Sequence, residues 1–179
     1  MGERIVIRTD LYKEARERRL LRICWAVFNK FAFPLLHNKL RILSLRLFGA
    51  KIAESCHMYG SVKVYAPWRL TLGSWVCIGP RVEIYNKADV RIGSHVVVSQ
   101  DAYLCTASHD VNSLRMDLVT APVTIESNAW LAAKSAILPG VTVGEGAVVG
   151  ACAVVAKDVP PWSVTVGNPA AVVRCRRAG

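Results

Sequence analysis

A six-residue spacing of apolar side chains runs from Ile52 to Val155 and is interrupted once. The residues that keep this spacing are Ile52, Met58, Val64, Leu72, Ile78, Ile84, Ile92, Val98, Leu104, Ile125, Leu131, Ile137, Val143, Val149 and Val155. A surface helix requires apolar residues three and four apart, and a two-faced strand requires strict alternation, so neither pattern fits. Six residues suit one short strand followed by one corner. The spacing therefore predicts a parallel β-helix in which three such units make one triangular coil.

The spacing divides the repeat into five predicted coils. They cover residues 52–69, 72–89, 92–109, 125–142 and 143–160. Two extra residues, at 70–71 and again at 90–91, fall at the same corner of successive coils and should enlarge that corner without shifting the register. Each coil buries its apolar row only against its neighbours, so such a solenoid needs several coils and a cap at each end. We expect an all-β solenoid over residues 52–160, followed by a C-terminal cap and basic tail over residues 161–179.

Residues 1–51 are expected to form a basic, amphipathic helical segment. They hold 12 of the 23 Lys and Arg residues and 4 of the 13 Asp and Glu residues, which is +8 of the net charge of +10. Asp10 can cap a helix over residues 11–30, and Pro34 must end or kink it. A second short helix is expected over residues 38–48.

Two interpretations of this segment stay open. In the first, its apolar face covers the open end of the β-helix and its basic face is solvated. In the second, residues 1–48 lie on an anionic membrane surface, and aromatic side chains insert into it. The aromatic side chains expected to insert are Trp25, Phe28, Phe31 and Phe33.

Composition predicts a cytoplasmic protein. The chain is 53% hydrophobic, but it lacks the roughly eighteen consecutive apolar residues of a membrane span, and its start does not resemble a secretory signal. Six cysteines lie at wide spacings without a C-x-x-C pair, which indicates reduced thiols. No nucleic-acid recognition motif accompanies the positive charge, so a nucleic-acid partner is not expected.

The interruption of the repeat covers residues 106–123 and predicts a long extruded loop. A loop of this length in a regular solenoid is usually functional. His109 lies at its start, and histidine can gain or lose a proton near neutral pH, although a histidine in a loop commonly has no catalytic role. Asp110 is an improbable partner because consecutive residues of an extended chain point to opposite sides. The group that orients His109 is expected elsewhere.

Several motifs resemble the hexapeptide-repeat acyltransferases, and most closely their sugar O-acetyltransferase branch, which includes colanic acid biosynthesis acetyltransferases. The motifs are CTASHD at residues 105–110, SNAWLAA at 127–133, PGVTVGEGAVVGACAVVAK at 139–157 and GNP at 167–169. The resemblance spans residues 38–175. It implies a left-handed coil, a homotrimer with active sites between neighbouring prisms, and acetyl-CoA bound along each cleft as acyl donor. It implies no metal.

By this resemblance His109 matches the family's catalytic histidine. A sugar hydroxyl is too weakly acidic to ionise alone at neutral pH, and a positioned base that takes its proton contributes about 10²–10⁴ in rate. The tetrahedral oxyanion would need a preorganised donor, such as a backbone N–H. A covalent intermediate on Cys105 is not required.

The resemblance also implies coenzyme contacts in the last two coils and the tail. Trp130 would pack beside the acetyl-pantetheine arm, although it could instead be a corner residue that shields the core. Ala133 stands where relatives often carry serine, and Ala171 where some carry arginine. Arg174, with Arg176 and Arg177, could pair with the coenzyme phosphates or be a solvated basic tail. The expected coenzyme-binding residues are Trp130, Ala133, Ala151, Ala156, Lys157 and Arg174.

Tyr85 and Asn86 are the candidate acceptor-binding residues, because the resemblance places them on the acceptor side of the cleft. Asp89, Arg115 and Asp117 could contribute. The alternative for Asn86 is a structural asparagine ladder or corner turn, and both readings stay open.

The function expected is acetyl-CoA-dependent O-acetylation of a sugar or saccharide precursor of a surface polysaccharide. Three alternatives stay open. The acceptor could be an antibiotic or another small alcohol, or the solenoid could be a non-catalytic scaffold. A zinc enzyme resembling the γ-type carbonic anhydrases would need three imidazoles, but only His95 and His109 lie in the middle coils.

Overall fold

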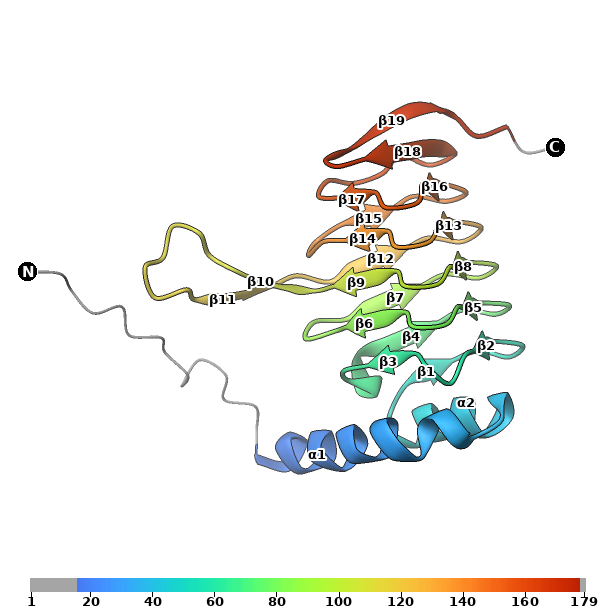
Figure 1. Ribbon diagram of the computed structural model, residues 1–179, viewed down its shortest axis with the longest axis vertical. Coiled ribbons are helices and arrows are strands. Elements are labelled where there is room, and N and C mark those ends of the chain that lie inside the picture. Colours follow the sequence, from blue (N-terminus) through green and yellow to red (C-terminus); the bar gives the residue numbers. More distant parts are fainter. Residues whose placement is uncertain (1–15, 178–179) are drawn as a thin grey trace, which may run out of the picture.

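The computed structural model describes residues 16–177 and shows a triangular prism of stacked coils with helices across one end (Figure 1). Three parallel sheets form the faces of the prism. Sheet A contains β1 (Lys51–Ile52), β4 (Leu70–Leu72), β7 (Val90–Ile92), β12 (Val123–Ile125) and β15 (Thr142–Val143). Sheet B contains β2 (His57–Met58), β5 (Cys77–Ile78), β8 (Val97–Val98), β13 (Trp130–Leu131), β16 (Val148–Val149) and β18 (Ser163–Gly167), with β19 (Ala170–Cys175) antiparallel at its end. Sheet C contains β3 (Lys63–Val64), β6 (Glu83–Tyr85), β9 (Tyr103–Cys105), β14 (Ala136–Ile137) and β17 (Val154–Val155).

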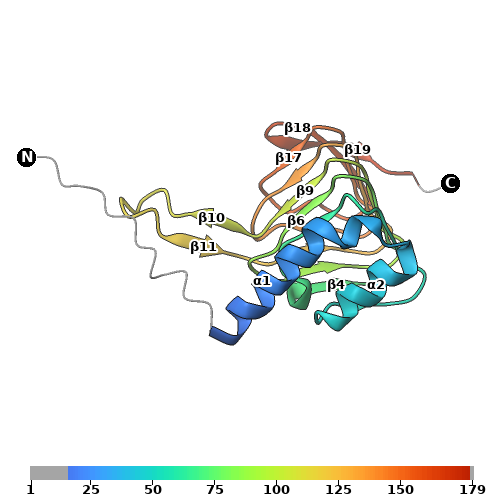
Figure 2. The ribbon, with the colours of Figure 1, turned by 60° about the horizontal axis from the view of Figure 1, so that its bottom comes forward.

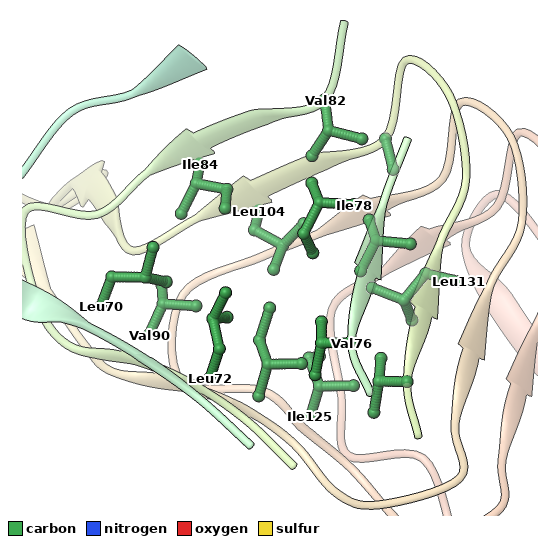
Figure 3. Close-up of a cluster of buried hydrophobic side chains, with 14 of the residues drawn as sticks. Leu70, Leu72, Val76, Ile78, Val82, Ile84, Val90, Leu104, Ile125 and Leu131 are labelled. Carbon is green, nitrogen blue, oxygen red and sulfur yellow. The ribbon is translucent and has the colours of Figure 1, made fainter. Parts of the chain in front are cut away.

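The predicted register is confirmed along all three faces. In sheet A, Ile52 aligns with Leu72, which aligns with Ile92. The row continues through Ile125 to Val143 across the interruption without a slip. All these side chains are buried, and Figure 3 shows members of the three rows meeting in the centre of the prism. The extra residues at 70–71 and 90–91 lie in the longer strands β4 and β7, which pair in register.

The solenoid extends beyond the predicted end at residue 160. β18, at Ser163–Gly167, pairs in parallel with β16, and just before the predicted end Val159 forms a parallel bridge with Val143. These contacts make a partial sixth turn. The chain then reverses at residues 167–169, and β19 returns antiparallel along β18. The C-terminal cap is therefore a β-hairpin on sheet B.

The third coil ends earlier than predicted. β9 ends at Cys105, and the chain leaves the prism as an antiparallel hairpin of β10 (Ala107–His109) and β11 (Leu118–Thr120). The hairpin projects sideways from the middle of the prism (Figure 1). His109 therefore lies on this hairpin, within the loop predicted over residues 106–123. The count of six had also placed His109 at the end of the third coil, and that part of the prediction is wrong. The repeat resumes at β12.

The helices cap the first coil. α1 (Arg16–Phe31), the short 3₁₀ helix η2 (Phe33–Leu35) and α2 (Asn38–Leu47) cross the end of the prism (Figure 2). A further 3₁₀ helix, η3 (Pro67–Arg69), lies at the corner before β4. The predicted first helix began near residue 11, but residues 11–15 lie outside the described part of the chain. None of the helices within residues 16–177 is long and apolar enough to cross a membrane.

The inner face of this helical cap joins the core of the prism. Trp25 is 1% exposed, and its indole N–H donates a hydrogen bond to the Val64 carbonyl at 2.7 Å. Phe33 is buried, and Phe28 packs against the same core. The prediction that Trp25 and Phe33 insert into a membrane is therefore wrong, because both rings are buried. Phe28 is partly buried. Phe31, the fourth, is exposed.

Glycine is required where successive coils approach most closely. A Cβ atom at Gly93 would lie 2.6 Å from the Ser127 backbone nitrogen of the next coil. The coils cannot separate locally without breaking the ladder hydrogen bond from the Gly93 N–H to the Ile125 carbonyl, which is 2.7 Å long.

Gly93→Ala is expected to lower the free energy of unfolding by about 1–3 kcal/mol, the usual cost of overpacking. Urea unfolding followed by circular dichroism measures it. Gln100→Ala, at an exposed corner of the same coil, should change stability by less than about 0.5 kcal/mol. Equal stability of the two variants would contradict the close approach of the coils.

Candidate active site

The hairpin fixes the ring of His109 through a backbone carbonyl. His109 is exposed on β10 opposite Leu118, and its Nδ1 atom lies 2.6 Å from the Met116 carbonyl oxygen. A carbonyl oxygen can only accept a hydrogen bond, so Nδ1 must carry the proton. The neutral ring then has its lone pair on Nε2, which is the arrangement that a general base requires.

The turn of the hairpin holds Met116 in place. The Met116 N–H donates to the Ser113 carbonyl, and the Ser113 hydroxyl donates to Asp117 Oδ2 at 2.7 Å. Asp110 accepts from the Asn112 N–H within the same turn. As predicted, the group that orients His109 comes from elsewhere than Asp110. Its identity could not be read from the sequence, because the interaction uses a main-chain atom.

Cys105 does not present a free nucleophile. Its side chain is buried and donates to the Ala107 carbonyl, while the Tyr103 hydroxyl donates to Cys105 Sγ at 3.3 Å. Burial raises the pKa of the Tyr103 hydroxyl, and the bond to Cys105 acts in the same direction. The side chains of Tyr103 and Cys105 are thus held in hydrogen bonds at the base of the hairpin.

Tyr85 and Asn86 have different surroundings. Tyr85 is half-buried and stacks edge-on against Tyr65, with 5.2 Å between the ring centroids. Lys87 Nζ lies within 6 Å of both rings, at 5.7 Å from the centre of Tyr85 and 5.9 Å from that of Tyr65. Asn86 is fully buried, donates to the Ala66 carbonyl and accepts from the Ala66 N–H.

The acceptor-binding prediction for Asn86 is therefore corrected to a structural role. Both polar ends of its amide are occupied by one residue of the preceding coil, which is the ladder arrangement left open above. We keep Tyr85 as the candidate acceptor contact.

A groove of about 510 Å³ runs between α1 and sheet C beside Tyr85. Its walls combine aromatic rings with basic side chains from α1 and the first coil, including Tyr65, Lys30 and Lys63. Asn29 also faces it, and its Oδ1 atom is buried without a hydrogen-bond partner. The hairpin leaves the prism from the same sheet one coil further on (Figure 1). The α1 wall could not be predicted from the sequence, because the amphipathic pattern of a helix does not specify which face of a prism the helix packs against.

The predicted coenzyme contacts lie on two corners of the prism and on sheet B. Ala133 and Ala151 occupy the same corner between sheets B and C in successive coils, where the Cys152 N–H donates to the Ala133 carbonyl. Ala156 and Lys157 are exposed at the next corner, after β17. Trp130 is 46% exposed on sheet B and donates from Nε1 to Ser99 Oγ at 2.9 Å. Within a single chain, these predicted coenzyme-binding residues do not form one continuous site.

The basic residues of the tail divide by role. Arg174 is exposed on β19 and donates to the Cys175 carbonyl. Arg176 donates to the carbonyls of Asn128 and Gly146, both at 2.8 Å, and lies 6.0 Å from the centre of the Trp162 ring. Arg176 thus fastens the end of the chain to the coils, which leaves Arg174 as the better candidate for a phosphate.

A three-histidine zinc centre is not formed. His95 projects from a corner and stacks on Trp75, with the rings 6.5 Å apart and nearly parallel. Within residues 16–177 no three His, Cys, Asp or Glu side chains come together as a metal site would require.

The fold is a hexapeptide-repeat solenoid with an exposed histidine on a hairpin beside its third coil. Residues 122–157 match the family model described as bacterial transferase hexapeptide (six repeats). The chain is 42% identical over 158 residues to WcaF of Escherichia coli (strain K12), provisionally named a colanic acid biosynthesis acetyltransferase, and the match covers 87% of each chain. The chain therefore belongs to the hexapeptide-repeat acetyltransferases.

Solved structures agree. The hexapeptide-repeat acetyltransferase VCA0836 of Vibrio cholerae, in complex with acetyl coenzyme A, superposes with a TM-score of 0.83 at 26% identity, covering 92% of this chain and 91% of that one. A maltose O-acetyltransferase from Clostridium difficile superposes with a TM-score of 0.82, covering 91% of this chain and 90% of that one, and at 22% identity it supports the fold alone. The expected left-handed parallel β-helix is confirmed.

Proposed function

We propose that the protein transfers the acetyl group of acetyl-CoA to a hydroxyl of a saccharide precursor of a surface polysaccharide, with His109 as general base. The observation that carries the proposal is the hydrogen bond between His109 Nδ1 and the Met116 carbonyl, which leaves Nε2 able to accept a proton. The acyl donor is supported by the acetyl coenzyme A complex of the Vibrio protein. The acceptor class is supported by the colanic acid biosynthesis relative.

In this mechanism Nε2 takes the hydroxyl proton while the oxygen attacks the thioester carbonyl. The resulting tetrahedral oxyanion collapses, the C–S bond breaks, and the departing thiolate takes the proton back from the imidazolium. No residue is acylated, in keeping with the engaged thiol of Cys105. The carbonyl of Met116 stabilises the transient positive charge on the ring, since it continues to accept from Nδ1.

The coenzyme site is proposed to use Trp130, Ala133, Ala151, Ala156, Lys157 and Arg174. Because these residues occupy two corners and a face of one prism, a single coenzyme reaches them best when one group belongs to one copy and the rest to its neighbour. This placement supports a site shared between copies, and we propose the homotrimer with a site in each cleft that the family resemblance implies. The small side chains leave main-chain groups accessible to the pantetheine arm, and Lys157 and Arg174 supply charge for the phosphates.

The acceptor is proposed to enter the groove beside Tyr85. Aromatic rings pack against the C–H faces of sugars, and Lys30 supplies positive charge for an acidic sugar, whereas Lys63 lies 4.0 Å from Glu83 on the same wall. Arg115 and Asp117, in the turn between β10 and β11, are proposed to contribute to acceptor binding. We propose a cytoplasmic location, with peripheral contact at the inner membrane surface.

A thiol-release assay with acetyl-CoA tests the proposal across nucleotide sugars, oligosaccharides, lipid-linked saccharides and small alcohols. Saccharide-dependent release of thiol, with one acetyl added per acceptor by mass spectrometry, is the expected result. Turnover confined to small alcohols would favour the antibiotic-type alternative. Absence of both acetyl-CoA binding and turnover would favour the scaffold.

A further inference from the structure

The helical cap has a second apolar face that the prism does not cover. We define the outer cap face as Ile23, Val27 and Phe31 of α1, Leu35 of η2, and Leu43 and Leu47 of α2. These side chains are between 49% and 86% exposed. In a globular protein, a helix that is apolar on both sides is normally covered on both sides.

The two helices turn these residues away from the prism. At about 100° per residue, Ile23 and Val27 lie roughly 160° and 200° around α1 from the buried Trp25. Leu43 and Leu47 stand in the same relation to the buried Leu45 on α2. Since both helices cross the same end of the prism (Figures 1 and 2), the six side chains share that end of the molecule.

The helical cap carries charge of one sign. Residues 19–51 contain seven Lys or Arg residues and no acidic residue, and the next acidic residue is Glu54. Two of the seven are engaged within the fold, since Arg46 donates to the Ile52 and Ala53 carbonyls and Arg41 Nε is buried. Lys30 lines the groove between α1 and sheet C and also borders the outer cap face, where its Nζ lies 5.3 Å from the centre of the Phe31 ring. Lys39 and Arg19 are exposed beside the same face.

This combination selects the occupant. A second copy docked face to face would bring two positive surfaces together without an acidic residue to neutralise them. An anionic bilayer accepts apolar side chains below the headgroups and basic side chains among them. We propose that the outer cap face docks the protein on an anionic lipid bilayer, end-on to the prism.

Sedimentation with vesicles of equal parts phosphatidylglycerol and phosphatidylcholine tests the proposal on the full chain. The wild-type protein should bind at low salt and should bind pure phosphatidylcholine at least tenfold more weakly. The variant Ile23→Ser/Val27→Ser/Phe31→Ser should lose at least tenfold in partitioning. The matched control Val172→Ser/Val173→Ser replaces equally exposed apolar residues at the opposite end and should bind as the wild type.

Three results would overturn the proposal. The wild type could fail to bind the anionic vesicles, or the triple variant could bind as well as the wild type with a native circular dichroism spectrum. The triple variant could also change the oligomeric state by light scattering, which would make this face an interface between copies. Thiol release with soluble acceptors should be unchanged in the triple variant, so a failure of docking is distinguishable from a failure of the proposed enzyme activity.

Discussion

Replacing His109 by alanine is expected to lower kcat for acetyl transfer by a factor of about 10²–10⁴, the usual contribution of a positioned general base. The variant keeps the hairpin, because His109 is exposed and the β10–β11 pairing uses main-chain groups. The KM for acetyl-CoA should change little. Thiol release under saturating acceptor, as a function of pH, measures the effect.

Two neighbouring variants serve as controls. Ser108→Ala alters an exposed residue on the same strand and should retain wild-type kcat. Met116→Ala removes a side chain but keeps the carbonyl that orients His109, so it should retain most of the activity. A His109→Ala variant within tenfold of the wild type, with native circular dichroism, would contradict the assignment.

Replacing Trp25 by alanine is expected to lower the free energy of unfolding by about 3–5 kcal/mol, as for other buried aromatic residues. Trp25 packs against Phe33 and Phe48, with ring centroids 5.7 Å and 5.0 Å away, and donates to Val64. The substitution thus removes both packing and a hydrogen bond that ties α1 to the first coil. Urea unfolding measures the change.

The type of residue alone does not produce this loss. Trp75→Ala removes a ring that is 62% exposed and should cost less than about 1 kcal/mol. Trp25→Phe should fall between the two, at about 1–3 kcal/mol, because it keeps an aromatic ring but leaves the Val64 carbonyl unsatisfied. Equal losses for Trp25→Ala and Trp75→Ala would contradict the capping role of α1.

The repeat predicted much of the core of this protein residue by residue, because buried positions recur every six residues along the chain and packing cannot change that spacing. Its two ends were less predictable. Val159 and β18 continue the coil after the six-residue pattern weakens. This is possible because β18 pairs with β16 through main-chain hydrogen bonds, which do not require a particular side chain.

The candidate site was predictable in its types of residue but not in their partners. His109 follows from the interruption and the family resemblance, whereas the Met116 carbonyl does not, because every residue has one. For Asn86 the type of residue was misleading. An asparagine next to a candidate site suggests a ligand-binding role in the sequence, but the structure shows that its side chain is buried and bonded to the Ala66 main chain.

The level at which the β10–β11 hairpin leaves the prism fixes how far the proposed base, His109, lies from the helical end of the molecule. His109 departs after the third coil, two coil spacings of about 4.8 Å above the first, and the helical layer adds about 10 Å. A molecule docked through the outer cap face therefore holds His109 about 20 Å from the end that meets the lipid. A sugar joined directly to a membrane-embedded phosphate would lie below this reach. The geometry favours a hydroxyl on an outer sugar of a lipid-linked saccharide.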